Sequence, residues 1–171
     1  SQESDLPEQL EIQRRHLRAR GLAGLGDDVS ALLLLEDDES RAAEQLRVDI
    51  YRMTDDWSKA SKSLGKIVNM TGAKPSQPLT EEQASYILSH AIALTMGNND
   101  RVLSRLRKNY NEAMRETNLY DAFRLIATPE QFGLINYSAI SEKVKVVERF
   151  QSFMANYKDR LKSGEPLSSI N

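Results

Sequence analysis

The sequence contains no cysteine, and this absence excludes several kinds of site at once. A disulfide framework, a zinc site with thiolate ligands, thiol catalysis and c-type haem attachment all need cysteine. Long apolar runs are absent too: the longest covers only residues 31–35, whereas a membrane-spanning helix needs about 20 apolar residues. We therefore predict no disulfide, no thiolate-bound metal and no membrane-spanning segment.

An excess of charge of one sign is also missing. The chain has 23 Lys and Arg against 25 Asp and Glu, which gives a formal net charge of −2. A dedicated duplex-binding domain usually carries a basic excess, so the composition argues against one. A chain without cysteine suits the cytoplasm and the periplasm alike. We take the cytoplasm as the working prediction and keep the periplasm open.

Histidine is scarce, with only His16 and His90 in the chain. A carboxylate-bridged di-iron bundle needs a glutamate three residues before a histidine, but Gln13 and Ile87 stand at those positions. The chain also lacks a His-x₃-His pair for zinc, the glycine motifs that bind nucleotide phosphates and the Gly-x-Ser-x-Gly nucleophile motif. We therefore predict no cofactor, no metal site and no catalytic activity.

Glycine and proline are few, eight and five in 171 residues, and they fall mostly between periodic segments. This distribution is typical of helices separated by short turns. No comparable segment alternates apolar and polar residues with a period of two, so a sheet is not expected. The sequence predicts an all-α fold, a helical bundle with long helices over residues 41–71, 81–96, 101–126 and 139–163.

The strongest periodic signal lies in the first of these predicted helices. Apolar residues follow one another there at alternating spacings of three and four: Ala43, Leu46, Ile50, Met53, Trp57, Ala60, Leu64 and Ile67. This is the heptad pattern of a coiled-coil seam. It predicts one continuous helix whose apolar seam is covered either by the chain's own helices or by a second chain.

The predicted domain organisation follows from the helix boundaries. Residues 1–40 are expected to form an N-terminal helical arm, broken at the glycine-rich segment 21–26 because each glycine lowers helix stability by about 1 kcal/mol relative to alanine. Residues 41–164 form the bundle and residues 165–171 a frayed tail. Inside the bundle, Thr80 and Gln83 match a capping box at the start of the second long helix.

Seven residues are candidates for partner binding: Arg14, Arg15, Arg18, Trp57, Arg101, Arg105 and Lys108. The first three make the N-terminal segment basic, and the last three share one helix face because they stand at positions i, i+4 and i+7. Trp57 lies on the heptad seam, where its large ring can anchor either a core or a partner. A solvated helix face is the ordinary explanation for the cations.

These patterns favour a non-catalytic helical module for protein–protein interaction, acting as a subunit, adaptor or regulatory domain of a larger assembly. Its partner would be another protein or a second copy, bound through helical surfaces. Two alternatives stay open. One is a ligand-sensing helical bundle outside the membrane in a receptor, where arginines would meet ligand carboxylates. The other is a nucleic-acid-associated protein whose arginine clusters contact phosphates.

Overall fold

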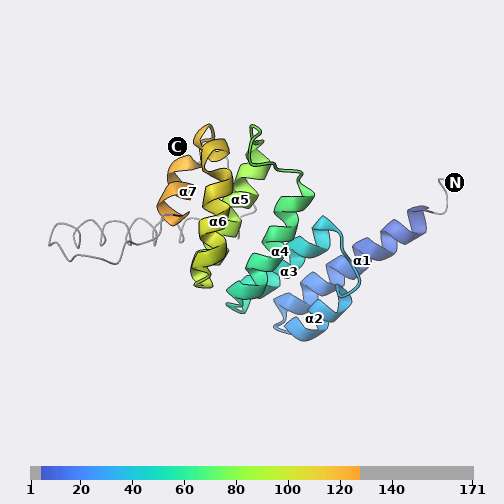
Figure 1. Cartoon of the computed structure of the whole chain (residues 1–171). Coiled ribbons are helices and arrows are strands. Elements are labelled where there is room, and N and C mark those ends of the chain that lie inside the picture. Colours follow the sequence, from blue (N-terminus) through green and yellow to red (C-terminus); the bar gives the residue numbers. More distant parts are fainter. Residues whose placement is uncertain (1–4, 128–171) are drawn as a thin grey trace. The chain divides into compact units, whose positions relative to one another are not determined.

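The computed structural model describes residues 5–127, and every regular element within them is a helix (Figure 1). The helices are α1 (Asp5–Gly24), α2 (Asp28–Leu34), α3 (Arg41–Met53), α4 (Trp57–Met70), α5 (Glu81–Met96), α6 (Asp100–Arg115) and α7 (Tyr120–Ala127). The predicted all-α class is confirmed for this part of the chain. The chain divides after Gly72 into two compact units.

In the first unit, the N-terminal segment shares a core with α3. Small and aliphatic side chains from three helices form this core cluster: Ala19, Ala23, Ala31, Leu35, Ala43, Leu46 and Ile50. The described part of the predicted arm, α1 and α2, therefore packs against α3. The reason is that alanines on α1 and α2 let the helix backbones approach closely, which a search for large apolar residues overlooks.

Helix α1 continues further than the glycine-rich sequence predicts. It passes through Gly21 and ends at Gly24, and the turn comes at Gly26, whose φ of 83° is a left-handed conformation that glycine adopts at no steric cost. Asp27 then starts α2, because its side chain accepts a hydrogen bond from the backbone N–H of Ser30 at 3.2 Å. Burial of alanines on the inner face of α1 offsets the low helix propensity of its glycines.

The predicted continuous helix over residues 41–71 is wrong, because the chain breaks at residues 54–56 and reverses direction. Thr54 Oγ1 donates to the carbonyl oxygens of Ile50 and Tyr51, Asp55 adopts a φ of 56°, and the Asp56 side chain accepts from the backbone N–H of Lys59. The Thr54 hydroxyl and the Asp56 carboxylate satisfy backbone groups at the two helix ends and so compete with helix continuation. The heptad spacing thus spans two helices.

A buried carboxylate on α3 forms an ion pair with the antiparallel helix α4. Glu44, near the start of α3, is only 1% exposed, and its Oε1 lies 2.7 Å from Nζ of Lys66, near the end of α4. The same oxygen lies 3.1 Å from a guanidinium nitrogen of Arg47. Arg47 also donates to the carbonyl oxygen of Leu35 after α2, so Glu44 contacts α4 directly and the segment after α2 only through Arg47.

The second unit contains α5, α6 and α7, which pack on one another. Helix α5 begins with the predicted capping box. The Thr80 hydroxyl accepts a hydrogen bond from the backbone N–H of Gln83, and the Gln83 side-chain oxygen accepts one from the backbone N–H of Thr80. The predicted helix over residues 101–126 is wrong as a single element, because α6 ends at Arg115 and α7 follows. Thr117 Oγ1 donates to Met114 O at 2.7 Å and so satisfies a helix-end carbonyl at the break.

The predicted helix over residues 139–163 and the predicted tail over residues 165–171 lie outside the described residues. Among the helices that are described, none combines the length and the apolar character needed to cross a membrane.

Candidate interaction surfaces

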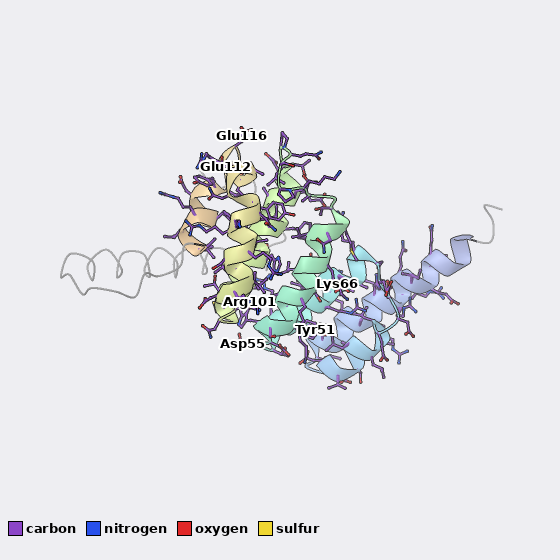
Figure 2. All side chains as sticks on the ribbon, viewed as in Figure 1. Tyr51, Asp55, Lys66, Arg101, Glu112 and Glu116 are labelled. Carbon is purple, nitrogen blue, oxygen red and sulfur yellow. The ribbon has the colours of Figure 1, made fainter. Side chains whose placement is uncertain are left out.

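Trp57, the aromatic candidate for partner binding, is a buried residue at the start of α4. The Arg52 guanidinium lies 6.0 Å from the centre of its ring, within the range of a cation–π interaction. Across the same corner, Lys59 Nζ lies 5.6 Å from the ring centre of Tyr51. Figure 2 labels Tyr51 and Asp55 at this corner. The geometry gives Trp57 a packing role between α3 and α4.

Arg15 differs from the other N-terminal arginines because it pairs within the chain. Its guanidinium lies 3.4 Å from Oδ2 of Asp38, and His16 Nε2 lies 2.7 Å from the same oxygen. Asp38 Oδ1 also accepts from Ser40 N–H at 2.9 Å. Burial alone would raise the Asp38 pKa, but the hydrogen bonds from Ser40 and His16 and the His16 charge hold that pKa well below 3.8.

Arg14 and Arg18, in contrast, lie on the exposed side of α1 and form no ion pair with any described residue. The side of α1 opposite the core carries a stripe at spacings of four and three, which we call the α1 stripe: Leu10, Arg14, Leu17, Gly21 and Gly24. Leu17 lies about 160° around the helix from the buried Ala19, at about 100° per residue. Leu17 is 65% exposed, and nothing lies within 4 Å of a Cβ built on Gly21 or Gly24.

Helix α2 presents a second apolar surface. Val29 and Leu33 stand four residues apart on this helix and are 81% and 68% exposed, and Leu25, in the turn that precedes the helix, is 86% exposed. The exposed Glu36 and Asp37 follow at the end of the helix, and neither side chain forms an ion pair with a described residue. We call these five residues the α2 stripe. On α2, Ala31 and Leu35 face the core, so the α2 stripe points to the opposite side.

The two stripes belong to one rigid pair of helices. Both α1 and α2 contribute alanines to the same core cluster with α3, so the residues opposite those alanines on each helix face away from α3. Asp38 lies four residues after the last residue of α2, and its contact with Arg15 and His16 brings the segment after α2 beside the middle of α1, so the two helices run antiparallel. Exposed apolar side chains of this number on two adjacent helices are uncommon on a solvated surface.

The three C-terminal candidates share the exposed face of α6, as their spacing predicts. Arg101, Arg105 and Lys108 are exposed and form no ion pair with any residue in the described part of the chain. Figure 2 labels Arg101 near one end of α6 and Glu112 and Glu116 near the other. Further along the helix, Arg115 lies 3.3 Å from a carboxylate oxygen of Glu112, so the cations of α6 without an ion pair to a described residue lie within residues 101–108. The neighbouring Tyr110 is buried and its hydroxyl donates to Ala73 O at 3.2 Å, which keeps its ring from stacking on a base.

His90 is the one described histidine without an ion pair. Burial lowers its pKa from 6.5 to about 4, and its Nδ1 has no hydrogen-bond partner among residues 5–127. The ring is therefore neutral at pH 7. Within the same residues, no group of three or more His, Cys, Asp or Glu side chains is placed to hold a metal ion.

No protein-family model, curated protein or solved structure matches this chain. Its function is therefore inferred from its own surfaces.

The exposed apolar residues and the buried charges are the features that sequence patterns missed. Leu10 and Leu17 are large apolar residues of α1 that are exposed, whereas Ala19 and Ala23 occupy the buried side of the helix. The sequence of α1 contains two apolar stripes, one of small residues and one of large residues, and either of them could mark the buried side. For Glu44, its spacing from Arg47 was visible, but the approach of Lys66 needed the reversal between α3 and α4.

Proposed function

We propose that this protein is a non-catalytic helical interaction module that binds another protein chain through the outer surface of α1 and α2. The observation that carries the proposal is the exposure of Leu17 and of three aliphatic residues of the α2 stripe. Burying a leucine or valine side chain contributes about 1.5–3 kcal/mol relative to its exposed state. A partner that covered these side chains would gain that free energy.

The rigidity of the helix pair supports the same function. The inner sides of α1 and α2 are fixed by the alanine-rich core, and Asp38 ties the two helices together. Binding therefore orders few additional backbone residues, and a preformed surface loses less conformational entropy when it binds a partner. The two helices can thus present their outer residues as one template.

A photo-crosslinking amino acid placed at Val29 tests the proposal in the source cells. We expect a covalent adduct with a protein, since this side chain is exposed at the centre of the α2 stripe. The matched control places the same amino acid at Met70, an exposed apolar residue on α4 away from both stripes. If Val29 gives no more adduct than Met70, and a second probe at Leu17 also gives none, the proposed function is wrong.

The basic face of α6 offers a second surface for an acidic partner. Arg101, Arg105 and Lys108 are cations on one side of a helix that form no ion pair with residues 5–127, and their spacing suits carboxylates along a partner helix. Replacing all three by Glu should abolish binding through this face. Retention of oligonucleotide binding at low salt by the parent chain, and its loss in this variant, would instead identify a nucleic-acid surface.

A further inference from the structure

We propose that the partner of the α1–α2 surface is a second copy of this chain, with α1 of each copy packed on α2 of the other. This inference rests on the proposed function, because it names the occupant of the same surface. It is carried by two complementarities between the stripes, one of charge and one of shape.

The charge complementarity lies in the residues that accompany each stripe. The α1 stripe carries Arg14 and is bordered by Arg18, whereas the α2 stripe ends in Glu36 and Asp37. All four side chains are exposed and none pairs with a described residue. Two α1 stripes facing each other would repel, and so would two α2 stripes. Only α1 against α2 brings opposite charges together.

The shape complementarity sets glycines against large side chains. Gly21 and Gly24 leave open space on the α1 stripe, while Val29 and Leu33 project from the α2 stripe. Glycine allows another element to approach the helix backbone closely. A partner's aliphatic side chain can therefore rest on each glycine.

The registry of the two stripes makes these pairs coincide. Asp38 lies beside Arg15 and His16, so residues of α1 and α2 at the same level have numbers that add up to about 53 along antiparallel helices. We place a two-fold axis parallel to the helices, between the outer surfaces of the two copies. Rotation about this axis sets α1 of one copy against α2 of the other, and each residue keeps its level along the helices.

This axis produces three matched pairs. Val29 falls opposite Gly24, Leu33 falls opposite Gly21, and the end of the α2 stripe falls opposite Arg14 and Arg18. Leu17 lies at the edge of the contact that Val29 and Leu33 make with the glycines and shields it from solvent. A stable interface usually buries about 800 Å² on each partner, and this one has a small apolar centre. We therefore expect a reversible dimer whose population depends on concentration.

Charge exchange tests the inference with the full chain. The variant Arg14→Glu with Arg18→Glu and the variant Glu36→Lys with Asp37→Lys should each weaken self-association about tenfold or more, because both now oppose like charges. A one-to-one mixture of the two variants should restore the dimer, since each α1–α2 contact again joins opposite charges. Sedimentation equilibrium from about 1 µM to about 1 mM covers the range of weak interfaces.

The matched control for the arginine variant is Lys62→Glu with Lys74→Glu, which makes the same change in net charge as that variant on exposed residues outside the stripes. We expect this variant to dimerise like the parent. If self-association weakens equally in the control, net charge rather than the α1–α2 charge pairs controls association, and the proposed pairing is overturned. A parent chain that stays monomeric throughout the concentration range would overturn it as well.

Gly21→Leu separates association from folding. Nothing lies within 4 Å of the new Cβ, and leucine has the higher helix propensity, so the folded chain should become more stable. The same leucine fills the space that Leu33 of the second copy needs, so association should weaken about tenfold. Unchanged association would contradict the proposed registry. An adduct of Val29 with a different protein would support the proposed function and overturn this inference.

Discussion

His16 Nε2 lies 2.7 Å from Oδ2 of Asp38, and this contact joins the middle of α1 to the segment between α2 and α3. The Asp38 side chain is 8% exposed and the His16 side chain 16%, so the pair is largely shielded from solvent. The contact sets the registry of the α1–α2 pair, and with it the alignment of the two outer stripes.

Replacing Asp38 by Asn should lower the free energy of unfolding by about 2 kcal/mol. The amide cannot accept charge-assisted hydrogen bonds from His16 and Arg15, and it leaves their donors poorly satisfied. Urea denaturation measures the change. Asp37→Asn is the matched control, because Asp37 is exposed and forms no ion pair within the described part of the chain, and it should stay within about 0.5 kcal/mol of the parent. Equal effects of the two variants would contradict the role of Asp38.

Acid should destabilise the chain in two separate pH ranges. The pKa of His90 is lowered from 6.5 to about 4, so the unfolded state binds more protons between these values and stability falls as the pH drops from 6.5 to 4. The pKa of Asp38 is lowered from 3.8, so its contribution is present above pH 3.8 and is lost as the pH falls further.

Urea midpoints measured from pH 8 down to pH 2 would resolve these ranges. His90→Gln should flatten the dependence between pH 6.5 and pH 4 and leave the lower range unchanged. Asp38→Asn should flatten only the part below pH 3.8. A midpoint that rises as the pH falls from 6.5 to 4 would contradict the burial of neutral His90.

Removal of the Glu44 carboxylate should be costly, whereas removal of its lysine partner should not. Glu44→Ala leaves the Arg47 guanidinium, whose side chain is 12% exposed, without its carboxylate, and should destabilise by about 3 kcal/mol. Lys66→Ala should change stability by about 1 kcal/mol or less, because the Lys66 side chain is 62% exposed. Chemical denaturation measures the loss of unfolding free energy in each variant. A larger loss for Lys66→Ala than for Glu44→Ala would refute the prediction that the carboxylate is the more important partner.

The corner between α3 and α4 should tolerate only certain residues at position 55. Asp55 has a φ of 56°, a left-handed conformation that β-branched residues avoid, so Asp55→Val should destabilise by about 1–2 kcal/mol. Asp55→Gly should be neutral or slightly stabilising, since glycine enters this region freely. The difference between the two thermal midpoints is the measurement. Similar midpoints would indicate that the two helices can join into one.

Local chemistry explains which helix boundaries the sequence predicted. The capping box of Thr80 and Gln83 was found because all its groups lie within four residues. The break at Thr54, Asp55 and Asp56 was missed because the heptad spacing continues across it. A three-residue connection between antiparallel helices preserves that spacing, so periodicity alone cannot tell one helix from two.

The candidate surface was predictable only in part. Exposure of Arg14, Arg18, Arg101, Arg105 and Lys108 agrees with the solvated-face explanation and leaves them available to a partner. Arg15 pairs with Asp38 and Trp57 is buried, and these contacts depend on residues from other helices. No local pattern in the sequence marks either outcome.

The sequence by itself determined the helical class, the absence of thiol chemistry and the common face of Arg101, Arg105 and Lys108, because composition and spacing fix these locally. Tertiary structure decided which side of each helix is covered. In α1, either the alanines or the leucines could have faced the core, and packing against α2 and α3 buried Ala19 and Ala23. Close approach of three helices leaves room only for small side chains, so Leu17 and the α2 stripe remain outside.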